Sequence, residues 1–506
     1  MTPTALESKT TPAKGPIRSA RFQIPLLLAL ALLFTGCQTP RVTSPDSADA
    51  DPDAHPAPVP PPLALETFDA AWQLIHDTHF DTNFNGVDWL SLRDELRPLV
   101  ARAVTWTEVD GIIQEMIGRL GQSHFTLLPG DLPGIEPEPF DESTSTQPTG
   151  GASLPQPVRE TRGDQSGHPG FEVRPAGEHW LVTWIDPDSP AQRAAIEPGW
   201  IVTAIDDEPV SDLASLPGEL DSSHTVMLAW SALRSHLDGP VGSRVTVQFL
   251  DASDQPRTFK LERGEERGDP VKLGNLPPIP TFFESSLLHS DAGSTIGVIS
   301  FNAWMLPAVG DFDRAIDRFR TADGIVIDLR GNVGGIGGMV MGVAGHFFEE
   351  PVRLGTLKTR TGELHFVANP RTVNPAGERV SPYNGPVALL TDPLSASTSE
   401  IFAAGMQTHG RVRVFGQATP GAALPALFSR LPNGSLLMHA IADFVTPDGT
   451  RIEGRGVLPD EPVPLRREDL LAGRDQPLLQ AIQWIDRQAR DPIPDKKAVD
   501  ESAVLQ

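Results

Sequence analysis

Cysteine is almost absent from this sequence, with a single residue, Cys37, among 506. One thiol cannot form an intrachain disulfide, and it cannot supply a cysteine cluster for a structural metal site. Basic residues are also scarce, because 41 Lys and Arg stand against 66 Asp and Glu and leave a formal net charge of -25. Such a chain repels phosphates at long range, which argues against a nucleic-acid-binding protein. Its length is that of a multidomain protein.

Long apolar runs are missing as well. The run at 24–34 is shorter than the about 20 residues that a membrane-spanning helix needs. Four basic residues precede this run and Thr35, Gly36 and Cys37 follow it, which is typical of a secretory signal over 1–37. The order FTGC resembles a bacterial lipobox, which implies a lipid on Cys37. Gln38 after it implies the periplasmic face of the outer membrane in the bacterial cell envelope. An uncleaved anchor or plain secretion are the alternatives, and all three place the remaining chain outside the cytoplasm.

Composition then predicts a tether, a helical domain and a linker. Residues 38–62 are rich in Pro, Ala, Asp and Ser, so they form an extended tether without a core. Within 63–130, apolar residues recur at helical spacing, most clearly from Val109 to Leu120, and Gly121 is placed to end that helix. This region is predicted to be a small helical domain. Residues 131–168 are acidic and rich in Pro, Gly, Ser and Thr, which predicts a flexible linker.

Short runs of alternating apolar and polar residues mark the region 169–264. HWLVTWI (179–185), WIVTAID (200–206) and SRVTVQFL (243–250) have the period of two that predicts half-buried strands. The segment DSPAQRAAIEPGWIVTAIDDEPV (188–210) resembles the PDZ family, whose members bind an extended C-terminus at a sheet edge. The glycines of the usual binding loop are not evident here. A small β-domain without a peptide groove is therefore the alternative.

Residues 291–490 are predicted to form an α/β domain. IGVISF (296–301), GIVIDLR (324–330) and PVALLTD (386–392) are apolar or β-branched runs bounded by turns, which predicts buried strands. Glycine-rich or amphipathic stretches separate them. The expected fold is therefore a multidomain α+β protein with a helical, a PDZ-like β and an α/β domain.

The segment LSASTSEIFAAGMQ (394–407) follows one of these strands and opens a helix. A serine at such a junction has its hydroxyl near the positive end of the helix, which favours an oxyanion beside it. Serine is also a common helix N-cap, and Glu400, three residues after Ser397, would complete a capping box. The segment alone leaves a nucleophile and a structural cap equally open.

The loop DLRGNVGGIGG (328–338) also follows a predicted strand. Glycine permits positive φ and lets backbone N–H groups point into a cleft, as an oxyanion hole requires. A glycine-rich loop can also cradle phosphate. However, the Gly-Lys-Ser or Gly-Lys-Thr of a P-loop does not follow, which disfavours that function.

In order along the chain, DLRGNVGG, SASTSEIFAAG, GQATPG (416–421) and IEGRGVLPD (452–460) lie behind the PDZ-like segment. Together they resemble the tail-specific or C-terminal-processing peptidase family over residues 63–485. The resemblance implies a serine peptidase that acts on polypeptides, with Ser397 as the nucleophile. It also implies that the catalytic domain is of the ClpP/crotonase-like type.

Lysine is the absence that bears most on mechanism. The best-known branch of this family pairs its serine with a lysine in a Gly-Lys step, and that place here is Ala422. No lysine occurs from Ser397 to Asp495. Serine is weakly nucleophilic at its free pKa and needs an adjacent base, so either another base exists or the enzyme is inactive.

A substitute base is present in LGQSHF (120–125), where His124 follows the predicted helix. This motif resembles the Leu-Gly-x-Ser-His of the tricorn protease core, a branch of the same broad family that uses serine, histidine and glutamate. The resemblance implies that His124 is the general base. It further implies that Ser123 and Glu453, the latter in a Glu-x-x-Gly-Val-x-Pro-Asp motif, orient the imidazole and balance its charge.

We therefore expect an extracytoplasmic serine endopeptidase that hydrolyses unfolded or tail-presented polypeptides through an acyl-enzyme. The backbone N–H groups of Gly334 and Thr398 would bind the oxyanion. The mechanism calls for no metal and no cofactor. Two alternatives are an inactive PDZ scaffold or chaperone, and a carrier of hydrophobic ligands that would have an apolar cavity in place of a polar cleft. Substrate, cleavage-site preference and oligomeric state do not follow from the sequence.

Overall fold

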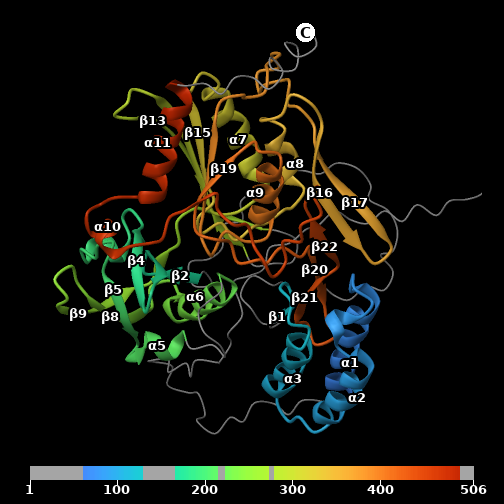
Figure 1. Ribbon diagram of the computed structural model, residues 1–506. Coiled ribbons are helices and arrows are strands. Elements are labelled where there is room, and N and C mark those ends of the chain that lie inside the picture. Colours follow the sequence, from blue (N-terminus) through green and yellow to red (C-terminus); the bar gives the residue numbers. More distant parts are fainter. Residues whose placement is uncertain (1–60, 129–165, 215–222, 273–277, 491–506) are drawn as a thin grey trace, which may run out of the picture.

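The computed structural model describes residues 61–128, 166–214, 223–272 and 278–490. The predicted signal with Cys37, nearly all of the predicted tether and most of the predicted linker lie outside these ranges. Figure 1 shows a large α/β domain with two smaller units side by side at one end of it. Within the described ranges, no helix combines the length and the apolar character that crossing a membrane requires.

The first described segment, residues 61–128, forms a helical unit. Its elements are α1 (Pro61–Thr78), η1 (Phe84–Gly86), α2 (Trp89–Val100), α3 (Trp106–Gly118) and β1 (Thr126–Leu128). Helix α1 begins two residues earlier than expected, because proline is tolerated in a first helical turn. A capping box between Thr105 and Glu108 opens α3, and Gly121 follows its end at φ 59°.

This helical unit is not self-contained, because a distant hairpin completes it. Strand β1 pairs with β21 (Leu436–Ala440), which pairs with β20 (Ala426–Arg430). Leu424, Leu431 and Leu437 pack into the core that the three helices form. The sequence placed these residues in the α/β domain, and only tertiary packing assigns them to the helical unit.

The second unit contains the three strands predicted in this region. Its main elements are β2 (Ser166–His168), β3 (Phe171–Ala176), β4 (His179–Ile185), α4 (Pro190–Arg193), β5 (Ile201–Ile205), β6 (Glu208–Pro209), α5 (Val210–Leu213), α6 (Ser223–Leu237), β7 (Gly239–Pro240), β8 (Arg244–Leu250), β9 (Pro256–Glu262) and β10 (Gly264–Glu265). The sheet order is β3-β4-β5-β8-β9, with β6 on β5, so β3 is an edge strand. Helix α6 was not predicted. Its Met227, Trp230 and Leu233 are buried in the core of this unit.

Two short strands, β11 (Asp269–Val271) and β12 (Ile279–Thr281), lead into the α/β domain. Its elements are β13 (Phe283–His289), β14 (Thr295–Phe301), α7 (Leu306–Arg318), β15 (Gly324–Asp328), α8 (Met339–Ala344), β16 (Val352–Thr359), β17 (Gly362–Ala368), β18 (Val387–Thr391), α9 (Thr398–Thr408), β19 (Arg413–Gly416), β22 (Ala442–Val445), β23 (Glu461–Pro462), α10 (Arg467–Leu471) and α11 (Gln476–Arg490). Because β13 belongs to the main sheet, this domain starts before residue 291.

The main sheet has the order β13-β14-β15-β18-β19-β23 and is parallel from β14 onward. The largest core joins one of its faces to α7, α8 and α9, and a smaller core joins the other face to α11. Strands β15 and β18 are parallel neighbours, so the loops after them leave the same edge. The glycine-rich loop and the segment with Ser397 are therefore adjacent, where open α/β sheets usually bind ligands.

Candidate active site

Ser397 lies at the N-terminal end of α9 in a strained backbone conformation. Its φ of 55° and ψ of -116° are unfavourable for a residue with a side chain. The Ser397 N–H donates to Ala422 O (2.9 Å) and to the Glu400 carboxylate (3.0 Å), which holds this conformation. The backbone therefore presents the hydroxyl at a fixed place at the sheet edge.

His124 comes to Ser397 from 273 residues earlier in the chain, and its Nε2 lies 3.3 Å from Ser397 Oγ. The imidazole stands between the end of α3 and the start of β1, on a residue whose φ is 62°. Pairing of β1 with β21 anchors the loop on its C-terminal side. A distance of 3.3 Å is at the long end of hydrogen bonding, and such contacts often tighten when substrate binds.

Ser123 connects the imidazole to Glu453. Ser123 Oγ lies 2.8 Å from His124 Nδ1 and donates to Glu453 Oε2 (2.8 Å), while the Ser123 N–H donates to Glu453 Oε1 (2.8 Å). A hydroxyl has one proton, so Ser123 accepts from a protonated Nδ1 while it donates to the carboxylate. His124 Nε2 then carries a lone pair directed at Ser397, as a general base requires.

These side chains are nearly closed off from solvent, with exposed fractions of 5% for Ser397, 2% for His124 and 8% for Glu453. Burial lowers the pKa of His124 to about 3, and the nearby His224 acts in the same direction. Burial raises the pKa of Glu453, against hydrogen bonds from Ser123 and Ala423 that lower it. The imidazole is therefore neutral at pH 7 and able to accept a proton.

The two predicted oxyanion donors lie beside the serine. A side chain at Gly334 would place its Cβ 2.7 Å from Ser397 Cβ and 3.1 Å from Thr398 N, and φ is 106°, so only glycine fits there. The Gly334 N–H donates to Asn332 Oδ1 (3.0 Å), and Asn332 is fully buried. An oxyanion would have to draw this N–H away from Asn332 or share it.

Glu400 does more than the helix cap that the sequence suggested. It is completely buried and accepts hydrogen bonds from Thr419 Oγ1 (2.5 Å), Gly421 N (2.7 Å) and Ala422 N (2.9 Å), besides Ser397 N. Burial raises its pKa to about 8, while these hydrogen bonds act in the opposite direction. The spacing of Ser397 and Glu400 in the sequence did not indicate that Glu400 also accepts hydrogen bonds from residues 419–422.

The segment after Gly421 fills the place of the lysine-bearing turn. The Ala423 N–H donates to Glu453 Oε2 (3.0 Å), so two buried carboxylates, Glu400 and Glu453, hold successive residues. Ala422, Ala423 and Leu424 each pack into a different core, those of the second unit, the α/β domain and the helical unit respectively.

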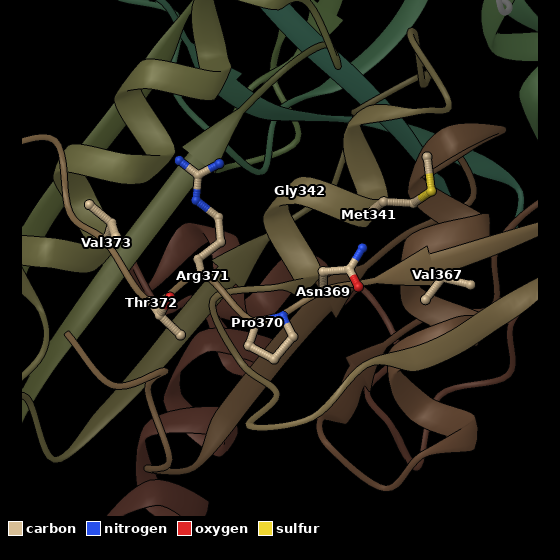
Figure 2. A pocket seen from close by; sticks show the side chains of 8 residues that line it. All are labelled: Met341, Gly342, Val367, Asn369, Pro370, Arg371, Thr372 and Val373. Atoms are coloured by element: carbon tan, nitrogen blue, oxygen red, sulfur yellow. The ribbon is translucent and has the colours of Figure 1, made fainter. Parts of the chain in front are cut away.

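Elsewhere in the described ranges, no cluster of three or more His, Cys, Asp or Glu side chains is arranged to hold a metal ion. A pocket of about 580 Å³ is lined by residues of α8, β17 and the segment after β17. Figure 2 shows the side chains that line it. Arg371 in its lining pairs with Asp313, which also contacts His346. The catalytic candidates do not line this pocket, whose mixed polar and apolar lining is not that of an apolar ligand cavity.

Two family profiles match this chain. Residues 295–463 match Peptidase family S41, and residues 64–118 match the Tricorn protease C1 domain. The first match contains the glycine-rich loop, Ser397 and Glu453. The second match ends just before Ser123 and His124. The first match lies within the α/β domain and the second within the helical unit.

Two relatives are similar to this chain over most of its length. A carboxyl-terminal-processing protease of Synechocystis sp. is 26% identical over 400 residues, which are 78% of this chain and 79% of the relative. The chloroplastic carboxyl-terminal-processing peptidase 2 of Arabidopsis thaliana is 26% identical over 405 residues, covering 78% and 68%. The fold resembles the photosystem II D1 C-terminal processing protease (TM-score 0.52, 19% identity, 79% and 93% covered) and mature CPAF (TM-score 0.57, 12% identity, 86% and 99% covered).

Proposed function

Because this chain belongs to peptidase family S41 and is a serine-type peptidase, we propose that it cleaves polypeptides with Ser397 as nucleophile and His124 as base. The observation that carries this proposal is one hydrogen-bonded chain of four side chains. It runs from Ser397 through His124 and Ser123 to Glu453, with separations of 3.3, 2.8 and 2.8 Å. The four residues come from three separate parts of the sequence.

Each group has a role that its contacts support. Ser397 Oγ attacks the scissile carbonyl carbon and passes its proton to His124 Nε2, which later gives that proton to the leaving amine. Glu453, through Ser123, stabilises the imidazolium that forms in between. The N–H groups of Thr398 and Gly334 bind the oxyanion, at roughly 3 kcal/mol of transition-state stabilisation per donor. Water then hydrolyses the acyl-enzyme by the same proton transfers in reverse.

The test compares His124→Ala, Ser397→Ala and Lys358→Ala on an unstructured peptide. We expect each of the first two variants to lose on the order of 10²-fold or more in kcat, and their double variant to lose little more, because the residues act as a unit. Lys358 is exposed on β16, so Lys358→Ala should turn over like wild type. If His124→Ala kept more than about a tenth of the wild-type rate, the base would be another group.

A second experiment, labelling with a fluorophosphonate probe, separates the enzyme from its alternatives. An inactive scaffold or a ligand carrier would not react with a fluorophosphonate probe, whereas an activated Ser397 is modified by it. Labelling of wild type and absence of labelling in Ser397→Ala is the expected result. Labelling of neither protein would instead favour the scaffold or chaperone.

We infer that the substrates are unfolded or C-terminal polypeptide segments. Two considerations support this: relatives are named for carboxyl-terminal processing, and β3 is the edge of the β3-β4-β5-β8-β9 sheet. An extended C-terminus can pair with such an edge, as in PDZ domains. Helix α6 lies beside β3 and would form the other wall of a PDZ-like groove.

We also propose that the protein acts outside the cytoplasm on a lipid anchor at Cys37, supported by the N-terminal pattern alone. Wild type should be recovered with the bacterial envelope and, after solubilisation, partition into the detergent phase. Cys37→Ala should lose its lipid and be recovered in the aqueous fraction, with peptidase turnover unchanged. Membrane retention of Cys37→Ala equal to that of wild type would mean that another feature anchors the chain.

A further inference from the structure

One buried residue, His79, contacts the residues on both sides of Ser123 and His124 in the catalytic loop. This histidine follows the last residue of α1 and is fully buried. Its Nε2 lies 3.0 Å from Gln122 Oε1, and its ring stacks on Phe125 with centroids 5.5 Å apart and planes 16° from parallel. Gln122 and Phe125 are the immediate neighbours of the Ser123–His124 pair.

His79 is itself held in place by a backbone contact. Burial lowers the pKa of His79, so the ring is neutral and has a single N–H. When Nε2–H donates to Gln122 Oε1, Nδ1 accepts from the Asp81 N–H (3.1 Å). The ring is therefore a rigid support between α1 and the catalytic loop.

Such support matters because the loop tolerates little displacement of His124. His124 has a φ of 62°, a conformation that persists only when its surroundings enforce it. The Nε2 to Ser397 Oγ separation is 3.3 Å, so a small displacement would break the contact. Misplacement of a reacting group by about 1 Å can lower a rate by on the order of 10²-fold.

We propose that His79 is a positioning residue for catalysis, which holds the Ser123–His124 pair against Ser397 through Gln122 and Phe125. This inference rests on the proposed function of His124 as base. The motifs do not indicate this role, because His79 lies 45 residues before His124 and outside them.

The experiment uses the full chain and compares His79→Phe, Gln122→Leu and the double variant with wild type. Phenylalanine at 79 keeps the stacking on Phe125 and removes the hydrogen bonds with Gln122 and with the Asp81 N–H, while leucine at 122 removes only the bond between Gln122 and His79. Each single variant should lower kcat by on the order of tenfold to a hundredfold with KM little changed. The double variant should be no worse than the worse single variant, because both remove the same bond.

His346 provides a matched control away from the proposed site. It is buried, and its Nε2 lies 2.9 Å from Asp313 Oδ1 rather than from any residue of the catalytic loop. His346→Phe should lower the melting temperature but keep the wild-type kcat at temperatures where it is folded. An equal loss of kcat in His346→Phe and His79→Phe would show that His79 is merely structural.

A folded His79→Phe with wild-type kcat would also overturn the inference. If that variant does not fold, Gln122→Leu decides, because Gln122 is only half-buried. Failure of the proposed function would be distinct, since wild type would then neither hydrolyse the peptide nor react with the fluorophosphonate probe.

Discussion

In the hydrogen-bonded chain from Ser397 to Glu453, burial displaces the pKa values of two ionisable side chains in opposite directions. Burial lowers the pKa of His124 to about 3 and raises that of Glu453 above its ordinary value of 4.5. The base works when His124 is neutral, hence at a pH above about 3. Charge stabilisation works when Glu453 is ionised, hence only above its raised pKa. As pH falls, Glu453 is the first of the two to change state.

We therefore predict that Glu453, and not His124, sets the acid limb of the activity profile. A solvent-exposed histidine would instead give a limb at about pH 6.5. In Glu453→Gln, the plateau of kcat/KM should fall by on the order of 10²-fold or more, because the charge that stabilises the imidazolium is lost. The remaining acid limb should move to lower pH, toward the pKa of His124.

The measurement is kcat/KM from about pH 4 to pH 8 for both proteins, at temperatures where both are folded. An unchanged limb near about pH 6.5 in both would contradict the lowered pKa of His124. It would mean that the imidazole is hydrated in the active form.

The element that places His124 is the pairing of β1 with β21. Thr126 pairs with Met438 and Leu127 with Leu437, so the chain just after His124 is fixed to a hairpin from the far end of the sequence. Leu437 is fully buried in the core of the helical unit. Strand β21 therefore contributes both to the core of the helical unit and to the placement of His124.

We predict that Leu437→Ala destabilises the helical unit and lowers kcat together. Truncation of a fully buried leucine leaves a cavity and costs about 2–5 kcal/mol. Leu364→Ala on β17 is the matched control, since Leu364 is 47% exposed and should lose little stability or activity. Thermal unfolding and peptide turnover measure the two effects. Equal behaviour of both variants would show that the hairpin does not support the site.

At the scale of the whole molecule, a buried ion pair joins the second unit to the catalytic loops. Arg174 of β3 donates to Asp392 (2.9 Å), and Asp392 also accepts from Gly331 N (2.9 Å) and Leu394 N (3.0 Å). Burial alone would raise the pKa of Asp392, but the charge and hydrogen bond of Arg174, together with the hydrogen bonds from the N–H groups of Gly331 and Leu394, outweigh burial and lower that pKa. The pair thus links β3 with both loops of the proposed site.

We predict that Arg174→Ala lowers stability by roughly 3–5 kcal/mol, because it leaves the buried Asp392 carboxylate without its cation. Arg257→Ala is the control. Arg257 pairs with Asp251 at 2.8 Å but is 54% exposed, and such surface pairs contribute about 0–1 kcal/mol. Thermal unfolding of the full chain measures both. A loss in Arg174→Ala no larger than in Arg257→Ala would mean that the pair does not hold the units together.

The sequence alone predicted the positions of six strands and nominated the residues of the proposed site. Strands β4, β5, β8, β14, β15 and β18 lie where period-two or short apolar runs predicted them. These features are local, because a backbone that alternates sides imposes its period on neighbouring residues. Ser397, His124, Ser123 and Glu453 were identifiable because each belongs to a short motif.

Tertiary structure decided everything that depends on which distant residues become neighbours. It brought His124 within 3.3 Å of Ser397, gave hairpin 426–440 to the helical unit, and surrounded Glu400 with donors from residues 419–422. It also set the pKa values of His124 and Glu453, since desolvation is a property of the packed interior. A linear motif specifies which side chain is present. The pKa of that side chain and its hydrogen-bond partners depend on the atoms that folding places around it.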